Sequence, residues 1–272
     1  MHKNEQIVRK ATHSEIPEIV SLWQEVFGDA PAYVKRFIAH LGIENCYVCE
    51  IEGKIAAMAF SLPTSLFCRS NALPVRYVYA CATRLQYQKQ GIMAKLLTTV
   101  YNEACSENTT ALFLRAADEH LATYYRKLGF QDFFYQKCLT FNRNERKKNA
   151  NAAIIFLTSN TYYNKRIQKL KSNCFVNWNE DFFRFLKEDK MQFCEYENAI
   201  FSFKIENSMI MVDEFLGDTA DLRIINYLFE YYTDIETIKV ISLGNNICCG
   251  QIQWCKPVKQ MPQHGYFAFG ME

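Results

Sequence analysis

The feature that most constrains this chain is an apolar segment followed closely by a glycine and a helical pattern. Residues 75–85 read VRYVYACATRL, residues 86–90 are polar, and Gly91 precedes the helical sequence MAKLLTTVYNEACSEN. An apolar run rich in β-branched and aromatic residues predicts a buried strand. The chain must therefore pass from a strand through a tight turn into a helix, and such crossings are typical of α/β folds.

The turn at Gly91 has two interpretations. A helix N-terminus carries unpaired N–H groups and a partial positive charge, and a glycine lets the backbone approach a phosphate without an intervening Cβ. Gln88 and Gln90 add hydrogen-bond donors, and Lys89 adds positive charge. A glycine before a helix is also a common turn residue. The stretch alone leaves phosphate binding and a plain turn both open.

The rest of the first half alternates helical and strand patterns. Apolar residues at helical spacing predict helices at 12–27, 31–41, 93–108 and 120–129. Apolar runs predict strands at 46–53, 54–67, 75–85, 111–116 and 132–141. This order predicts an α/β layer with helices packed on a central sheet.

A polar, charged stretch without periodicity then separates two parts of the chain, and we interpret it as a linker. The sequence therefore predicts domains at 1–142 and 152–272, joined by a linker at 143–151. In the second part, helices are expected at 161–170, 178–189 and 219–232, and strands at 153–159, 199–217 and 237–243. Its strand-to-helix crossing, DEFLGDTADLR, has no glycine turn comparable to that at Gly91.

Charge and composition exclude several classes of protein. The chain has 272 residues and a net charge of +2, from 31 Lys and Arg against 29 Asp and Glu, so we expect no nucleic-acid partner and no membrane surface. We expect no secretory signal and no membrane span. The eleven cysteines are scattered and odd in number, which predicts free thiols in a reducing cytoplasm, no disulfide framework and no metal site.

The surroundings of Gly91 resemble a known family. Gln88-Lys89-Gln90-Gly91-Ile92-Met93, followed by a helix with paired leucines, resembles the acyl-CoA loop of the GCN5-related N-acetyltransferases (GNAT). Gln88 stands where Arg is commoner in that family, and Met93 occupies a position usually held by a small residue. The preceding AlaCysAlaThrArg, 80–84, resembles the cofactor strand of the two-domain branch typified by the enhanced-intracellular-survival proteins.

A second match lies downstream of the first. TyrTyrArgLysLeuGlyPhe, 124–130, resembles the family's Tyr-x-x-x-Gly-Phe segment, and it follows the predicted strand at 111–116 as the family requires. The resemblance covers the first half well and the second half as a weaker restart of the same pattern. It implies a GNAT-like mixed central sheet flanked by helices, followed by a smaller, degenerate GNAT-like α/β domain.

The resemblance also implies a cosubstrate, acetyl-CoA, and an acceptor, the amine of a small molecule or peptide. The family's cofactor-binding positions correspond in this sequence to Cys81, Ala82, Thr83, Gln88, Lys89, Gln90, Gly91, Ile92, Met93, Ala94 and Asp118. Transfer would proceed by direct attack of the amine on the thioester.

Direct attack needs a proton donor for the leaving thiolate and a base for the amine. Tyr125 occupies the family's general-acid position, four residues before Gly129; the alternative is that Tyr125 packs and Tyr124 faces the site. For the base, the resemblance suggests the α-carboxylate of Glu272, on an aromatic tail that docks inward. Glu25 and Asp29, at the end of the first helix, are candidates to attract a cationic amine.

Other functions compete with amine acetylation. A non-catalytic acyl-CoA-binding sensor or interaction module is the main alternative, because Gln88 and Met93 depart from the family pattern. A tandem transferase that moves aminoacyl groups from tRNA is disfavoured, because no basic stripe is visible. The sequence identifies neither the acceptor nor the oligomeric state.

Overall fold

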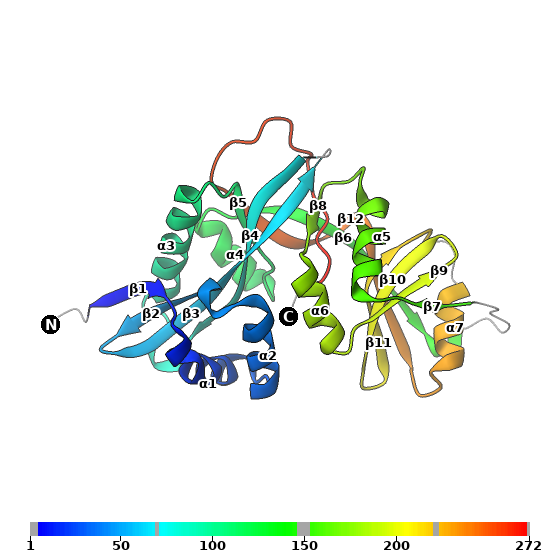
Figure 1. Ribbon diagram of the computed structural model, residues 1–272, viewed down its shortest axis with the longest axis horizontal. Helices are drawn as coiled ribbons and strands as arrows, with labels where there is room; N and C mark the ends of the chain where they lie inside the picture. The colour runs from blue at the N-terminus through cyan, green and yellow to red at the C-terminus, as the bar shows by residue number, and fades with distance from the viewer. Residues whose placement is uncertain (1–4, 69–70, 146–152, 220–222, 271–272) are drawn as a thin grey trace.

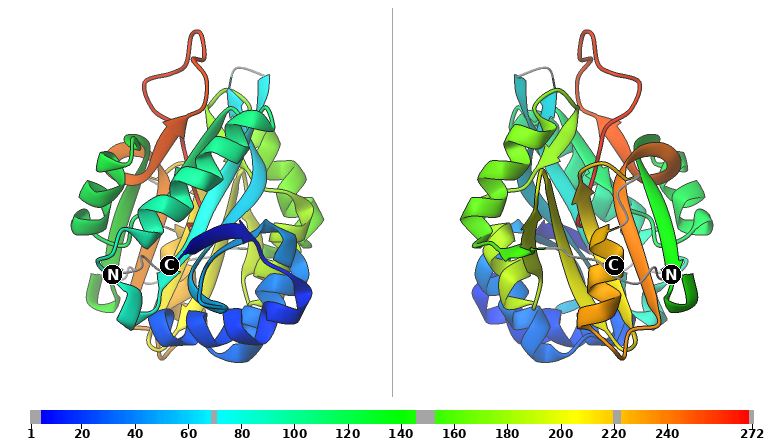
Figure 2. Two further views of the ribbon diagram at one scale, coloured as in Figure 1. Left: turned by 90° about the vertical axis from the view of Figure 1, so that its left-hand side faces the viewer. Right: turned by 90° about the vertical axis from the view of Figure 1, so that its right-hand side faces the viewer.

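The computed structural model describes residues 5–68, 71–145, 153–219 and 223–270. The described strands form one mixed sheet of twelve strands, with helices on its faces (Figures 1 and 2). The predicted α/β fold class is thereby confirmed.

The first half follows the predicted order of elements, with one addition. Its elements are β1 Gln6–Lys10, α1 Ile16–Phe27, α2 Pro31–Leu41, β2 Cys46–Ile51, β3 Lys54–Cys68, β4 Asn71–Thr83, α3 Ile92–Ser106, β5 Ala111–Leu114, α4 Glu119–Lys127 and β6 Gln131–Asn142. Strand β1 was not predicted, because QIVRK is short and carries two basic side chains; it forms the sheet edge, antiparallel to β2.

The second half restarts the pattern with shorter elements. They are β7 Ile155–Phe156, α5 Ser159–Leu170, β8 Phe175–Asn177, α6 Glu180–Glu188, β9 Gln192–Tyr196, β10 Ala199–Glu206, β11 Met209–Leu216, α7 Arg223–Tyr231 and β12 Thr237–Trp254. The predicted strand at 237–243 is the beginning of β12, which runs for 18 residues. Strands β8 and β9 were not predicted.

Strand β12 links the sheets of the two halves. It pairs in parallel with β11 through residues 237–242, antiparallel with β6 along most of its length, and antiparallel with β5 through Gln251–Trp254. The sheet order is therefore continuous from β1 to β7. The division at 143–151 stays a prediction. Strand β12, which follows this division in the sequence, pairs with β5 and β6, which precede it.

The described start of the predicted linker is tied to the second half. Residues Arg143–Glu145 form the short 3-10 helix η4. The guanidinium of Arg143 donates hydrogen bonds to the backbone carbonyls of Phe229, Tyr232 and Ile235. Residues 146–152 lie outside the described part of the chain.

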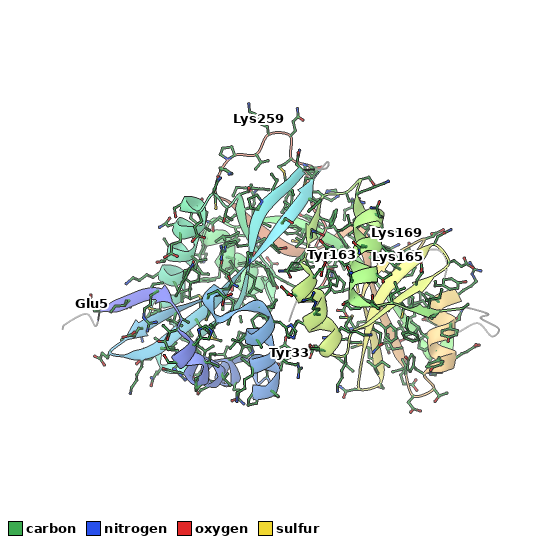
Figure 3. The ribbon with its side chains drawn as sticks, in the orientation of Figure 1. Glu5, Tyr33, Tyr163, Lys165, Lys169 and Lys259 are labelled. Carbon is green, nitrogen blue, oxygen red and sulfur yellow. A yellow bond between two sulfur atoms is a disulfide. The ribbon has the colours of Figure 1, made fainter. Side chains whose placement is uncertain are left out.

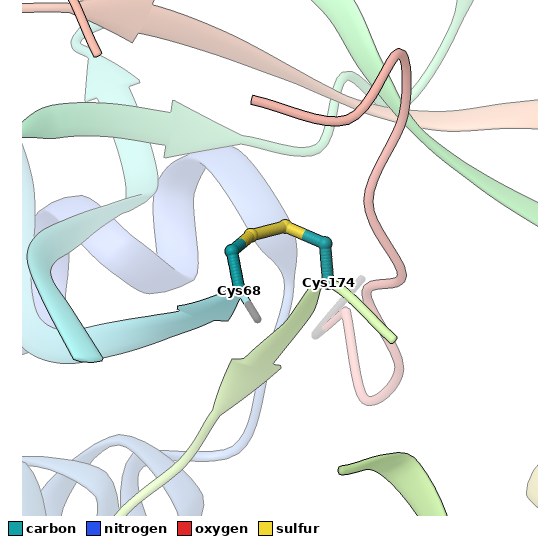
Figure 4. Close-up of a disulfide and its surroundings, with 2 residues drawn as sticks. All are labelled: Cys68 and Cys174. Atoms are coloured by element: carbon teal, nitrogen blue, oxygen red, sulfur yellow. A yellow bond between two sulfur atoms is a disulfide. The ribbon is translucent and has the colours of Figure 1, made fainter. Parts of the chain in front are cut away.

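A long hairpin and a disulfide connect the halves a second time. The end of β3 pairs with β8, so that Ser65–Phe67 lies opposite Phe175–Asn177. Just beyond this pairing, Cys68 and Cys174 form a disulfide (Figure 4). The prediction that the cysteines are free thiols is wrong for this pair, whose members lie 106 residues apart in sequence. The nine other cysteines are free.

The C-terminal segment runs between the two halves (Figure 1). Gly265 bridges to Phe134, and Tyr266 bridges to Phe175. Residues Tyr266, Phe267, Ala268 and Phe269 are buried, and Trp178 Nε1 donates a hydrogen bond of 3.0 Å to the carbonyl of Ala268. The predicted inward-facing aromatic tail is present as far as Gly270.

Helices of the two halves also pack directly against each other. Tyr33 of α2 lies toward α6 (Figure 3), and its ring centroid is 5.7 Å from that of Phe185. The largest apolar cluster accordingly combines side chains of both halves. Among the described helices, we find none with the length and apolar character needed to cross a membrane.

Candidate active site

The site begins at an irregularity in β4. In its ladder with β3, Ala82 lies opposite Met58 and Tyr79 opposite Phe60, so Ala80 and Cys81 together face the single residue Ala59. Ala80 adopts a left-handed backbone with φ of 51°. This is a β-bulge, which bends a strand and releases backbone groups from its ladder.

Strands β4 and β5 separate near this bulge. Residues Val75–Tyr77 of β4 pair in parallel with Ala111–Phe113 of β5, and the described residues of the two strands do not pair beyond that. The ends of the two strands then lead to different elements, α3 and α4. A ligand with an amide-bearing arm can hydrogen-bond to the released backbone in such a gap.

A cavity of about 480 Å³ occupies this region. Its walls come from the bulged part of β4, the end of β5, α4, the start of β6 and the middle of β12, together with Phe27 and Asp29. Of the predicted site residues, Cys81, Asp118 and Tyr125 line it. The lining does not include Ala82, Thr83 or the loop at 88–94. These residues follow the bulge in the sequence, from the end of β4 to the start of α3.

Tyr125 and Tyr124 differ in their surroundings. Tyr125 lines the cavity with 7% of its surface exposed, and its hydroxyl is near enough to the Cys81 thiol for each group to influence the pKa of the other. Tyr124 packs edge-on against the ring of Tyr125, with centroids 5.4 Å apart, and is not part of the lining. Between the two tyrosines, the structure thus brings Tyr125 to the cavity.

Burial sets the protonation of both Tyr125 and Cys81. Burial raises the pKa of Tyr125 well above its usual value, with a further contribution from Cys81. Burial also raises the pKa of the Cys81 thiol to about 12, although the nearby Tyr125 hydroxyl acts in the opposite direction. At neutral pH both groups hold their protons. A protonated thiol is a poor nucleophile, whereas a protonated phenol retains a proton to donate.

The turn after β4 has two residues in the left-handed backbone region. Gly91 caps α3 with φ of 75°, and Lys89 has φ of 61°. A Cβ built on Gly91 meets no atom within 4 Å, so the turn is open on that side. The first helical hydrogen bond runs from Lys95 N–H to Gly91 C=O. The backbone N–H groups of residues 91–94 are therefore the free donors expected of a helix start.

The side chains of Gln88 and Gln90, predicted as donors to a phosphate, form hydrogen bonds within the turn itself. Gln88 Nε2 donates to the carbonyl of Thr83 at 3.1 Å, and Gln90 Nε2 donates to that of Gln86 at 3.1 Å. One N–H of each amide thus braces the turn. Ile92 is buried, and Met93 and Ala94 are partly buried, so these three residues offer an anion mainly their backbone.

The acidic candidates separate into two groups. Asp118 lines the cavity and caps α4 by accepting a hydrogen bond of 2.7 Å from the N–H of Leu121. Asp29 also lines it and accepts a bond of 2.8 Å from Trp23 Nε1. Glu25, in contrast, is paired with Arg84 at 2.7 Å and is not part of the lining.

Sequence reasoning missed a polar network in the wall of the cavity. The guanidinium of Arg126 forms ion pairs with Glu119 at 2.6 Å and with Asp132 at 2.9 Å. Gln251 Nε2 donates to Asp132 at 3.0 Å. Burial by itself raises the pKa of Asp132, but hydrogen bonds from Arg126 and Gln251 outweigh it, so the pKa lies below its usual value. No local pattern signals this network, because Gln251 comes from β12.

The C-terminal segment approaches the cavity at Arg115. Arg115 lines the cavity, and its Nη1 lies 3.5 Å from the carbonyl oxygen of Gly270. Glu272, the predicted base, lies outside the described residues. Its role stays a prediction, and the described part of the tail ends beside a residue of the cavity wall.

Comparisons with known proteins agree with this architecture. A profile of the GNAT acetyltransferase domain matches residues 7–132. A GCN5-related N-acetyltransferase from Anabaena variabilis superposes with a TM-score of 0.75 at 12% identity, covering 93% of this chain and 73% of that one. Eis1 from Mycobacterium abscessus gives 0.65 at 11% identity, covering 92% of this chain and 74% of its own.

A tandem GNAT protein of the clavulanic acid biosynthesis pathway has a length closer to that of this chain. It superposes with a TM-score of 0.58 at 9% identity, covering 94% of this chain and 100% of that one. No curated protein sequence matches the chain. At these identities the structural likeness shows the fold and leaves the substrate open.

Proposed function

We propose that the protein transfers the acetyl group of acetyl-CoA to the amine of a small molecule or peptide, because a profile of the GNAT acetyltransferase domain matches residues 7–132. The observation that carries this proposal is the bulge at Ala80–Cys81, which opens β4 toward a cavity that Tyr125 also lines. The amine and acetyl-CoA would be bound together in a ternary complex.

In this proposal the cosubstrate lies along β4 and the start of α3. The pantetheine arm and thioester contact the backbone at Cys81, Ala82 and Thr83. The pyrophosphate is bound by the N–H groups at 91–94 and the turn formed by Gln88, Lys89 and Gln90, because the open side of Gly91 leaves room for it. Asp118 borders the acyl end of this path.

The reaction is an attack of a neutral amine on the thioester carbonyl. An alkylammonium ion has a pKa of about 10.4 and must first lose one proton. The nitrogen lone pair then forms the C–N bond, the C–S bond breaks, and its electron pair leaves on sulfur. Tyr125 gives its phenolic proton to that sulfur and regains one from the second proton lost by nitrogen. The products are an N-acetylated amine, CoA thiol and one released proton.

The α-carboxylate of Glu272 is the proposed base, and the position of Gly270 beside Arg115 supports it. Asp29, which also lines the cavity, has the charge to attract the ammonium form of the acceptor. The two-domain organisation, with a degenerate second GNAT-like domain, is also part of the proposal. A cytoplasmic location is proposed on the nine free cysteines.

The proposal is tested by following acetylated amine and CoA by mass spectrometry with wild type, Tyr125→Phe and Tyr124→Phe. Removing a general acid lowers kcat by about 10²–10⁴-fold, so Tyr125→Phe should lose activity by that factor while still binding acetyl-CoA. Tyr124→Phe, the matched control on the same helix, should stay near wild type.

Two outcomes oppose the proposal. If Tyr125→Phe and Tyr124→Phe both turn over at the wild-type rate, Tyr125 is not the acid. If wild-type protein binds acetyl-CoA but acetylates no amine, the acyl-CoA-binding sensor is the better account.

A further inference from the structure

Three of the apolar side chains that line the cavity are also exposed to solvent. Phe27 at the end of α1 is 44% exposed, Leu121 on α4 is 36% exposed, and Ile247 on β12 is 45% exposed. All three line the same cavity, although they come from three elements far apart in the sequence. Single exposed apolar residues need no explanation, but three around one cavity form a surface suited to an apolar ligand.

The charges at this cavity are unequally compensated. Glu119 and Asp132 are both paired with Arg126, and Asp118 accepts the capping hydrogen bond from Leu121 N–H. Asp29 accepts a hydrogen bond from the neutral indole of Trp23, and among the described residues it has no ion-pair partner. Asp29 and Asp118 are therefore the two lining carboxylates without an ion-pair partner among the described residues, and Asp29 lies two residues after Phe27.

We propose that the acceptor is a primary amine carried on an apolar body, such as an arylalkylamine or a medium-chain alkylamine. Its ammonium group approaches Asp29, and its apolar body contacts Phe27, Leu121 and Ile247. This inference rests on the proposed function and deepens it, because it specifies the class of the acceptor.

The same surface disfavours polar acceptors. A polyhydroxylated or polycationic amine would press hydroxyl or additional ammonium groups against these three apolar side chains. Such groups lose their hydrogen bonds to water without gaining partners, which is unfavourable.

The first experiment compares kcat/KM for phenethylamine, octylamine, spermidine and the aminoglycoside kanamycin at saturating acetyl-CoA. Contact of a phenyl or octyl group with an apolar wall is worth at least about tenfold in affinity. We therefore expect phenethylamine or octylamine to exceed spermidine and kanamycin by at least that factor. A higher kcat/KM for spermidine or kanamycin would overturn the inference while leaving amine acetylation intact. Bound acetyl-CoA with no acetylated amine would instead remove the proposed function, and the inference with it.

The second experiment asks whether Phe27 supplies the preference. Phe27→Ser should raise KM for phenethylamine about tenfold and change KM for spermidine little, whereas Phe27→Leu should restore most of the loss. Ile205→Ser is the matched control, because Ile205 is also 44% exposed but lies at the end of β10. An equal effect of Phe27→Ser on both amines would indicate a structural disturbance and contradict the role given to Phe27.

The third variant separates charge from packing. Asp29→Asn retains an oxygen that can accept the Trp23 Nε1 hydrogen bond, but it removes the negative charge. KM for all cationic amines should rise with kcat nearly unchanged. Unchanged KM in Asp29→Asn would exclude Asp29 as the ammonium site.

Discussion

Two strand-to-helix crossings, from β4 to α3 and from β11 to α7, start from the same kind of backbone irregularity and differ in what surrounds it. In the first half, β4 has a bulge at Ala80–Cys81. In the second half, β11 has one at Asp213, since Glu214 lies opposite Ser202 and Val212 opposite Phe203. The first bulge borders a cavity, and the second is packed.

Side chains account for this difference. Cys81 is a small, protonated thiol beside Tyr125. Glu214 is fully buried and forms an ion pair of 2.9 Å with Arg166, which is also fully buried. Tyr162 donates a further hydrogen bond to Glu214 at 2.9 Å. A charged cluster thus fills the core beside the second bulge, whereas the first bulge borders a cavity.

The glycines that follow β4 and β11 also differ in the space around them. A Cβ on Gly91 would meet no atom within 4 Å, whereas a Cβ on Gly217 would lie 2.5 Å from the Cβ of Ala199. The turn after β4 therefore has space for a ligand beside its backbone. At Gly217, just after β11, the space is occupied by the protein itself.

The largest expected effect is at the buried ion pair. Glu214→Ala leaves the Arg166 charge buried without its partner, which typically costs about 3–5 kcal/mol. Cys81→Ala removes one small side chain and should cost about 1 kcal/mol. Urea denaturation of both variants measures the difference in the free energy of unfolding.

The double variant Arg166→Met, Glu214→Leu is the control for this comparison. Replacing a buried pair by apolar groups is often neutral, so it should recover most of the loss seen in Glu214→Ala. Equal free energies of unfolding for Glu214→Ala and Cys81→Ala would break the proposed contrast between the two bulges.

A smaller effect is expected at the two glycines. Gly217→Ala forces a methyl group against Ala199 and should destabilise the fold by about 1–3 kcal/mol through overpacking, with acetyl-CoA affinity unchanged. Gly91→Ala should cost about 1–2 kcal/mol from its left-handed backbone and should also weaken acetyl-CoA binding. Thermal unfolding and calorimetry distinguish the two variants; equal loss of affinity in both would contradict the account.

The smallest effect concerns an ion pair near the surface of the first half. Hydrogen bonds from Arg9 lower the pKa of Glu15 from 4.5 to about 2. A lowered folded-state pKa contributes stability that is present above the unfolded value and is lost as the pH falls. The stability of wild-type protein should therefore decline between about pH 4.5 and 2 more steeply than that of Glu15→Gln. Parallel curves of unfolding free energy against pH would show that Glu15 contributes nothing in this window.

Many helices and strands of the first half could be predicted from the sequence, because the patterns that indicate them lie within short segments. The passage from an apolar run through Gly91 into a helix predicted β4, the turn and α3, and the resemblance of the 124–130 segment directed attention to Tyr125. The family resemblance is confirmed for residues 7–132. The roles of the individual residues remain predictions.

What the sequence did not reveal depends on contacts between distant segments. The continuation of β12 past Gly244–Asn246 was missed because Gly and Asn normally end a strand, whereas pairing with β6 and β5 extends it. Gln251 reaches Asp132, and Cys68 reaches Cys174, through the same kind of long-range pairing. These contacts carry no periodicity or spacing that a single sequence displays.

Binding of acetyl-CoA at the turn after β4 can be measured by calorimetric titration of acetyl-CoA into wild type, Gly91→Glu and Gly53→Glu. Gly53, in the turn between β2 and β3, has φ of 74° and equally open space, so Gly53→Glu controls for strain and charge. We expect binding at a micromolar level, about −8 kcal/mol, in wild type and Gly53→Glu, and none in Gly91→Glu. If folded wild-type protein binds no acetyl-CoA, or if Gly91→Glu binds it as wild type does, acetyl-CoA does not bind at this turn.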